Sequence, residues 1–307
     1  MMRAKCWLAG MVVLGLALQA AATEGGGGCY QSGGEGQMTG ALPPPGQYFL
    51  NYMLYYDADS LRDGSGHNVP VDFRADVAAE VARFVNVTPV TILGGNWAQH
   101  IIVPLVWADV SVGAPGGPRE SDKNFGLGDI DVDPFIIGWH KPPFHWIVGV
   151  DTYIPVGKYH GDEASLANIG RNYWTFEPIL AVTYLNEGGQ ELSAKMMYDI
   201  NTENHDTDYQ SGQEFHTDFV AAQHFKALKI GLDNWTAGVG GFWYYQTTDD
   251  EASGAKLDGS QGRQIALGPQ VGYQCCDIDF VLAFDHEFDT KNRAQGDRVW
   301  LKAVIPL

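Results

Sequence analysis

Residues 263–307 form three consecutive segments in which apolar side chains alternate with polar or small ones. The apolar positions of the three segments include Leu267 and Val271, then Phe280 and Leu282, then Val299 and Leu301. A period of two is that of a β-strand, because successive side chains point to opposite faces. We therefore predict three neighbouring strands, each with one apolar face and one polar face.

The polar faces of these segments carry charged groups such as Asp285, Arg298 and Lys302. Burying each charge in a dry core would cost roughly several kcal/mol, so we expect these faces to meet water. A soluble β-sandwich also alternates, but it buries its apolar face. Alternation alone does not separate a sandwich from a membrane barrel, so the spacing of the strands has to decide.

From residue 47 onward the same reasoning predicts twelve strands. They span residues 47–56, 70–87, 96–112, 128–139, 144–156, 171–184, 191–200, 214–226, 234–246, 263–273, 277–288 and 298–307.

The connections between these strands alternate in length. The long ones are rich in Asp, Gly and Ser, and they comprise residues 57–69, 113–127, 157–170, 201–213, 247–262 and 289–297. The connections at 140–143, 185–190 and 274–276 are tight, and those at 88–95 and 227–233 are intermediate. An even strand count with long loops at one end is typical of an up-and-down transmembrane barrel, with both termini on the short-turn side.

Such a barrel faces lipid with its apolar side chains and lines its lumen with polar ones. The polar parity of several strands is expected to point inward, and it comprises Asp72, Arg74, Asp76 and Glu80; Arg171 and Glu177; Lys195 and Asp199; and His216, Asp218 and His224. Trp235, Trp243 and Tyr245 lie near strand ends on the apolar parity, as aromatic girdles at membrane interfaces do.

The chain begins with a stretch typical of a secretory signal peptide. Arg3 and Lys5 precede an apolar run, and three alanines end at Ala22, after which we expect cleavage. Residues 23–46 are rich in Gly and Pro and form an N-terminal arm, interpreted either as a disordered leader or as a plug in the barrel mouth. The barrel is predicted to occupy residues 47–307.

The formal net charge is −18, and loss of the two cations in the predicted leader makes it −20. So acidic a protein repels nucleic acid, and we predict no nucleic-acid partner. The mature chain keeps Cys29, Cys275 and Cys276, an odd number that forms no disulfide framework. We find no G-x-S-x-G or H-E-x-x-H pattern and no phosphate-binding loop, so we predict no catalytic site and no cofactor.

Asp129, Asp131 and Asp133 stand at every second position and so project from one face of a strand. Such a row would attract cations into a channel or hold Ca²⁺. The alternative is a hydrated lumen face balanced by Arg74 or Arg171. A straight strand lacks the turns and the mixed oxygen ligands of calcium loops, so we favour this alternative and predict no metal site.

Further candidates for the substrate path are Arg171, Glu177, Lys195, His216 and Asp218. Arg171 shares a parity with Glu177, and His216 shares one with Asp218. Opposite charges across a lumen would narrow a pore and set its field, or they would brace the wall as salt bridges.

Six strings lie in order along the mature chain. They are ALPPPG at 41–46, GLGDI at 126–130, NIGRNYWTFEP at 168–178, YDINTEN at 198–204, TDYQSG at 207–212 and GDRVWLK at 296–302. In these strings the chain resembles a family of Gram-negative outer-membrane proteins named for the MetA pathway of phenol degradation and described as transporters. The resemblance implies an outer-membrane barrel that admits hydrophobic or aromatic compounds.

We therefore predict an all-β protein, an up-and-down antiparallel transmembrane β-barrel of about twelve strands in the outer membrane of a Gram-negative bacterium. Its expected role is passive transport of small hydrophobic or aromatic molecules, with membrane lipid and the transported molecule as its partners. Two alternatives remain open: a hydrolase built in the same barrel, and a secreted soluble β-sandwich that binds ligands. The oligomeric state is left undetermined.

Overall fold

The computed structural model describes residues 22–161 and 165–307. The predicted signal peptide, residues 1–22, lies outside the described residues except for Ala22. Within the described part, no helix is both long and apolar enough to cross a membrane.

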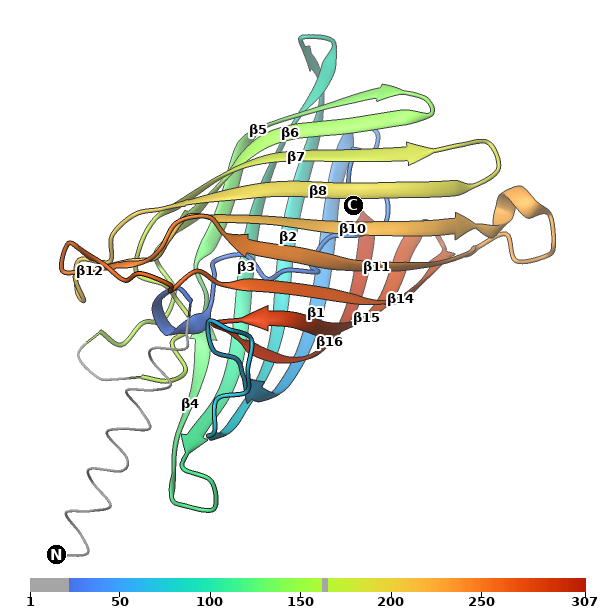
Figure 1. Ribbon diagram of the computed structural model, residues 1–307. Coiled ribbons are helices and arrows are strands. Elements are labelled where there is room, and N and C mark those ends of the chain that lie inside the picture. Colours follow the sequence, from blue (N-terminus) through green and yellow to red (C-terminus); the bar gives the residue numbers. More distant parts are fainter. Residues whose placement is uncertain (1–21, 162–164) are drawn as a thin grey trace, which may run out of the picture.

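The chain folds into a closed antiparallel β-barrel (Figure 1). Thirteen strands form one sheet; β4 pairs only with β3, and the other twelve close into a wall through the β2–β3 pairing. The wall strands are β1 (Gly46–Leu61), β2 (Asp72–Ile92), β3 (Gly95–Gly113), β5 (Ile130–Lys141), β6 (Phe144–Ile154), β7 (Thr175–Leu185), β8 (Gln190–Asn201), β10 (Glu214–His224), β11 (Trp235–Gln246), β14 (Arg263–Cys275), β15 (Ile278–Lys291) and β16 (Ala294–Pro306). The predicted barrel and its twelve strands are confirmed.

Short elements complete the fold: β4 (Arg119–Leu127), β9 (Tyr209–Gln210), β12 (Glu251–Ala252), β13 (Ala255–Lys256) and the 3₁₀ turns η1 (Glu24–Gly26) and η2 (Phe225–Leu228). Two predicted loops were partly wrong. Residues 119–127 of the supposed loop 113–127 form β4, which extends the β3 hairpin. The supposed loop 289–297 is mostly strand, because β15 and β16 turn tightly between Lys291 and Ala294.

The outer surface is apolar, which contradicts the sandwich alternative. Leu192, Val239 and Leu282 are 59%, 55% and 54% exposed, whereas Gln270 and Lys302 are buried on the opposite faces of their strands. A water-soluble sandwich would bury the apolar set instead. The soluble β-sandwich interpretation is therefore wrong, and the inward polar face predicted for β14, β15 and β16 is confirmed.

The predicted orientation of β2 is wrong. Arg74 pairs with Asp57 and Asp76 on the outside, and Glu80 accepts a hydrogen bond from Asn51 there. Phe73, Ala75, Val77 and Ala79 line the interior instead. With 21 residues, β2 far exceeds the ~9–11 that cross a bilayer, so its loop-side end extends beyond the membrane, where charges on the outer face meet water.

Aromatic pairs mark both rims of the apolar band. Trp235 stacks near Tyr273 at the short-turn end, and Trp243 packs edge-on against Phe215 at the loop end. Trp235 and Tyr245 lie ten positions apart on β11, about 33 Å along a strand. At a strand tilt of ~40° this projects to about 25 Å, the height of the apolar band in outer-membrane barrels.

The N-terminal arm enters the barrel at its loop end, shown in blue close to β12 in Figure 1. There the amide of Thr23 donates to Asp250 in the loop after β11. Near the other end the amide of Gly40 donates to Thr183, two residues before the end of β7. The arm then joins β1 at Gly46, so it runs along the whole interior from the loops to the short turns.

Candidate functional site

The interior of the barrel has an apolar side and a charged side. The inward faces of β1, β2 and β3 next to the loop end carry almost only Ala, Val, Leu and aromatic side chains. Most inward charged residues lie on β5 to β10 and on β15 and β16, and they include Asp151, Glu177, Lys195, His216 and Glu287. Arg83 on β2 and His100 on β3 also point inward, nearer the short turns than the apolar faces. A molecule inside the lumen therefore contacts apolar side chains on one side and charged side chains on the other.

A cavity of about 610 Å³ lies against the apolar side. Its apolar wall consists of Leu54, Tyr56, Phe73, Ala75, Val77, Ala79, Val106, Ala108, Val110 and Val112. The arm faces this wall across the cavity with Gly27, Gly28 and Tyr30, and Arg298 adds a charged group. The volume falls within the ~300–1,000 Å³ of sites for small organic molecules.

The arm is fastened to the charged side through Asp218 on β10. This buried carboxylate accepts hydrogen bonds from the Tyr30 hydroxyl at 2.5 Å and from the amides of Gly33 and Glu35, both at 2.9 Å. Lys302 on β16 donates to the carbonyls of Gly33 and Glu35. The backbone of the arm thus finds in the lumen the partners that a strand would find in a sheet.

Glu35 carries the charge that holds the middle of the arm. Its carboxylate lies 2.8 Å from Arg83 Nη1 and 3.7 Å from Lys195 Nζ. Burial alone would raise the pKa of Glu35, but the Arg83, Lys195 and Lys302 charges outweigh it and lower the pKa to about 2. The side chain is therefore ionised throughout the physiological range.

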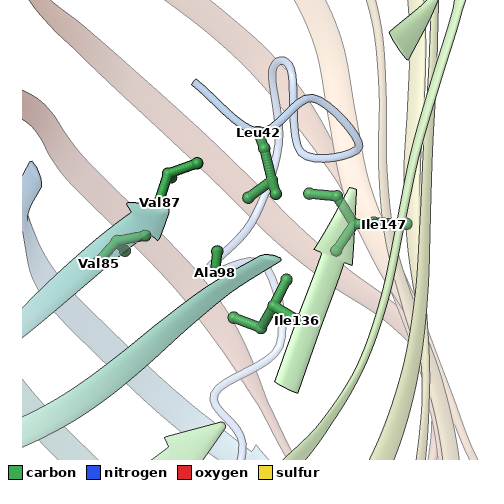
Figure 2. Packing of buried hydrophobic residues seen from close by; sticks show 7 residues of the cluster. Leu42, Val85, Val87, Ala98, Ile136 and Ile147 are labelled. Atoms are coloured by element: carbon green, nitrogen blue, oxygen red, sulfur yellow. The ribbon is translucent and has the colours of Figure 1, made fainter. Parts of the chain in front are cut away.

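An apolar cluster lies in the lumen near the short turns. Figure 2 shows Leu42 of the arm among Val85, Val87, Ala98, Ile136 and Ile147, which come from β2, β3, β5 and β6. Except for Leu42, these side chains belong to the wall. Leu42 thus packs the arm against one side of the wall at this level, and we call this cluster the constriction.

Two buried groups of one histidine and two carboxylates lie on the charged side. In the first, His100 Nε2 is 3.3 Å from Asp131 and 3.2 Å from Asp151. In the second, His216 Nε2 is 3.2 Å from both Glu177 and Asp199. All six residues are at most 5% exposed, so bulk water does not hydrate either group.

The predicted row of aspartates does face inward, but its carboxylates serve the backbone. Asp129 accepts hydrogen bonds from the amides of Gly157 and Arg171, and Asp133 accepts them from Phe135 and Val150. Asp131 accepts one from Thr152 and also faces His100. Arg74, proposed as a balancing charge, lies outside the barrel, so that part of the prediction is wrong.

The other candidates are brought together only in part. Lys195 pairs with Asp151 and Glu35, and His216 pairs with Glu177 and Asp199. Arg171 precedes β7, which begins at Thr175, and in the described part of the chain it makes no salt bridge with Glu177. The predicted strand start at 171 is therefore wrong, and Arg171 lies in the loop before β7, from where it still lines the cavity.

Sequence reasoning missed His100, Asp151, Arg83, Glu35 and Tyr30. His100 is the one ionisable side chain within residues 95–108 of β3, and Asp151 is the one carboxylate on β6, which is a signal that could have identified them. Nothing in the sequence of the arm indicates that Glu35 and Tyr30 meet residues more than 40 positions away. That proximity follows from the path of the arm through the lumen.

The chain has relatives of known structure but no match among curated protein sequences. An outer membrane channel from Pseudomonas putida F1 superimposes with a TM-score of 0.74 at 14% identity, covering 87% of this chain and 97% of that one. The translocator domain of the autotransporter NalP from Neisseria meningitidis gives a TM-score of 0.47 at 6% identity, covering 87% and 91%. A Pseudomonas aeruginosa FadL homologue gives 0.39 at 10% identity, covering 85% and 89%. Only the first likeness is close enough to support the fold.

A family model, described as the MetA pathway of phenol degradation, matches residues 58–303. The match leaves out most of the first strand and the last four residues of the barrel, and it covers the rest. The order of the six sequence strings, the closed barrel and this match agree, and the chain belongs to the MetA-pathway family of phenol degradation.

Proposed function

We propose that this protein is an outer-membrane channel through which small hydrophobic or aromatic molecules cross by passive diffusion. The observation that carries the proposal is the cavity of about 610 Å³ with a continuous apolar wall on β1, β2 and β3. An ordinary porin would line its pore with polar groups throughout, because its solutes keep their water. The apolar wall instead favours solutes that lose little by leaving water.

The family and the similar channel from Pseudomonas putida F1 support the same role. The export signal predicted at residues 1–22 and the apolar belt of the barrel fit the outer membrane of a Gram-negative bacterium. Transport of this kind needs no chemical reaction, because the solute crosses the membrane down its own concentration gradient.

We infer that residues 23–46 act as a plug within this channel. The arm borders the cavity, and with Leu42 it closes the constriction near the short turns. A solute that enters from the loop end therefore reaches the cavity first and passes on only when the arm moves. The inward charges Asp131, Glu177, Lys195, His216 and Asp218 then border the path on the side of the arm rather than forming an open ion pathway. Asp129, Asp133 and Arg171 hold the wall and loop in place next to it.

Liposome uptake tests the proposal. Purified protein is reconstituted into vesicles, and uptake of a fluorescent aromatic tracer is compared with uptake of a sugar of the same size. We expect the aromatic tracer to enter vesicles that contain the protein faster than it enters protein-free vesicles. We expect the sugar to enter either kind of vesicle only slowly. Equal uptake with and without protein would refute transport, and equal uptake of both solutes would refute the apolar selectivity.

A further inference from the structure

The second histidine–carboxylate group is made by three neighbouring strands. Glu177 lies on β7, Asp199 on β8 and His216 on β10, and all three side chains point into the lumen with at most 1% exposure. Glu214 on β10 stands opposite Asp199 in the strand register and is 2% exposed. Three carboxyl groups thus gather around one imidazole.

These groups lack the partners that buried polar atoms require. Among the described residues, neither ring nitrogen of His216, neither carboxylate oxygen of Glu177, and neither Asp199 Oδ1 nor Glu214 Oε1 has a hydrogen-bond partner. No Lys or Arg of the described chain forms a salt bridge with Glu177, Asp199 or Glu214. A protonated His216 would offset only one of the three negative charges, and a buried carboxylate without a counter-charge costs several kcal/mol, roughly, so the group calls for a further cation.

The first group, around His100, has the same composition, and His100 Nε2, Asp131 Oδ2 and Asp151 Oδ1 also lack hydrogen-bond partners, but this group already has cations of its own. Arg83 Nη2 lies 2.9 Å from His100 Nδ1, and because a guanidinium only donates, Nδ1 must accept. The proton of the neutral ring then sits on Nε2, which leaves no lone pair there for an ion. Lys195 lies 3.3 Å from Asp151, so this group also has its own cations.

We propose that Glu177, Asp199 and His216 bind one divalent transition-metal ion of the Zn²⁺ class. His216 Nε2 is 3.2 Å from Glu177 Oε2 and from Asp199 Oδ1, and the three donor atoms lie within 4.8 Å of one another. A tetrahedral ion with bonds of about 2.0–2.1 Å requires donors about 3.3 Å apart. The imidazole nitrogen favours Zn²⁺ over Ca²⁺ and Mg²⁺, which take shells of oxygen. Glu214 is not one of these three donors, but its carboxylate adds negative charge opposite Asp199 in the strand register.

The arm covers this site. The Tyr30 ring stacks on His216 with 4.9 Å between ring centroids and 22° between planes. A Cβ atom on Gly28 would lie 3.0 Å from Glu214 Oε2, so only glycine lets the backbone pass this close without pushing on the carboxylate. Gly28 and Tyr30 also border the cavity, and the arm therefore separates the ion from the path of the solute. An ion bound here stabilises the docked arm, because release of the arm would expose the ion's ligands to competing water.

Calorimetric titration of the chelator-treated, full-length protein in detergent tests the site, with ZnCl₂ as the probe. Two surface features must first be removed: the exposed His140–His145 pair, whose Nδ1 atoms are 2.8 Å apart, and the exposed Cys275–Cys276 pair. In a His145→Ala, Cys275→Ser, Cys276→Ser background we expect one Zn²⁺ per chain. Calcium and magnesium at a hundredfold excess should not displace it.

The matched controls are equivalent substitutions in the His216 group and in the His100 group. His216→Gln and Asp199→Asn should weaken binding at least 100-fold, whereas His100→Gln and Asp131→Asn should leave stoichiometry and affinity unchanged. Each variant is checked for a folded barrel by its heat-dependent mobility in detergent gels. Absence of Zn²⁺, Co²⁺ and Mn²⁺ binding in the background protein, or equal loss in both groups, would overturn the site.

The proposed coupling between the ion and the arm is tested separately through Cys29, with Cys275 and Cys276 replaced by serine. Zn²⁺ at 100 times its Kd should slow alkylation of Cys29 about 100-fold if the arm opens only from the ion-free state. The His216→Gln variant should show no slowing. Binding of one ion without any change in Cys29 alkylation would overturn the coupling between the ion and the arm.

Discussion

At the scale of single residues, the arm is held by a few buried polar contacts rather than by a strand ladder. Asp218 alone accepts three hydrogen bonds from the arm, and Glu35 pairs with charges on β2 and β8. Loss of one acceptor leaves buried donors without partners, which costs more than the net value of the bonds that are lost. The position of the arm should therefore respond sharply to single substitutions.

Asp218→Ala should release the arm. Removing the carboxylate strands the Tyr30 hydroxyl and two amides, which weakens docking by about 3 kcal/mol, or roughly 100-fold. Cys29 reports this, because burial raises the pKa of its thiol well above the ordinary value and keeps it unreactive. In a Cys275→Ser, Cys276→Ser background its alkylation should accelerate accordingly. Asp63→Ala, which removes similar backbone hydrogen bonds in an exposed loop, should have no effect.

Acid should also release the arm, through Glu35. The folded-state pKa of about 2 lies below the ordinary value of 4.5, so the ionised side chain stabilises docking above pH 4.5 by about 3 kcal/mol. That stabilisation is lost as the pH falls from 4.5 towards 2. Conductance in planar bilayers should rise over this interval. Glu35→Gln should conduct more at neutral pH and lose this acid response; an unchanged response would contradict the assignment to Glu35.

At the scale of elements, β1, β2 and β3 differ from the rest of the wall. They are the longest run of strands, their loop-side ends carry charges on the outside, and their inner faces are apolar. This arrangement inverts the usual barrel pattern just where the strands leave the bilayer. The cavity, and with it the proposed selectivity, depends on these three strands.

Filling the cavity should reduce transport. Ala108 on β3 lines the cavity, and Ala108→Trp would place an indole within it. We expect uptake of the aromatic tracer to fall at least tenfold while the barrel stays folded. Ala78 lies at the same depth on the outer face of β2, opposite Trp107, so Ala78→Trp is the matched control and should transport normally. Equal uptake by both variants would place the solute path elsewhere.

Opening the constriction should raise conductance. Leu42→Asp puts an unpaired carboxylate into the apolar cluster around Val87 and Ile147, which costs several kcal/mol, roughly, and expels the lower arm. Single-channel conductance should increase severalfold, as it should when residues 26–42 are deleted. The control is Leu93→Asp, because Leu93 lies in the turn between β2 and β3 and is 86% exposed. Wild-type conductance in both arm variants would exclude the arm as the plug.

At the scale of the whole molecule, the outer surface defines where lipid ends. Mid-barrel positions of β15 and β16 are paired leucines, Leu282 with Leu301, whereas the outer ends of β1 to β4 carry Asp57, Arg74 and Lys123. The apolar belt therefore surrounds the barrel at one height, and the charged hairpins stand above it. This places the cavity at the level of the outer rim and the constriction below it.

The height of the belt is measurable by arginine substitution. Leu282→Arg should destabilise the barrel folded in lipid vesicles by about 2–4 kcal/mol, as expected for arginine near the bilayer midplane. Ser111→Arg, on the outer face of β3 near the loop end, should cost only about 0–1 kcal/mol. Urea unfolding monitored by tryptophan fluorescence gives both values. Similar costs at the two positions would contradict the membrane position inferred from the charged strand ends.

The sequence alone determined the strands, their number and the outward face of β14, β15 and β16. It could do so because lipid accepts apolar side chains and the pleat alternates them, so the bilayer imposes a local pattern. The same rule led to the wrong face for β2, since it assumes that every strand lies wholly within lipid. Whether a charged face lies inside or outside depends on how far a strand projects beyond the bilayer. The residues of one strand do not determine this distance.

Only the tertiary structure decided the path of the arm and the composition of the interior. Glycine-rich segments carry no periodicity, so residues 23–45 gave no hint that Tyr30 stacks on His216 or that Glu35 meets Arg83. Likewise Glu177, Asp199 and His216 come from three strands, and strand register alone brings their side chains within reach of one ion. The contacts of the arm depend instead on the closure of the sheet, because only a closed wall surrounds one segment with the inward faces of distant strands.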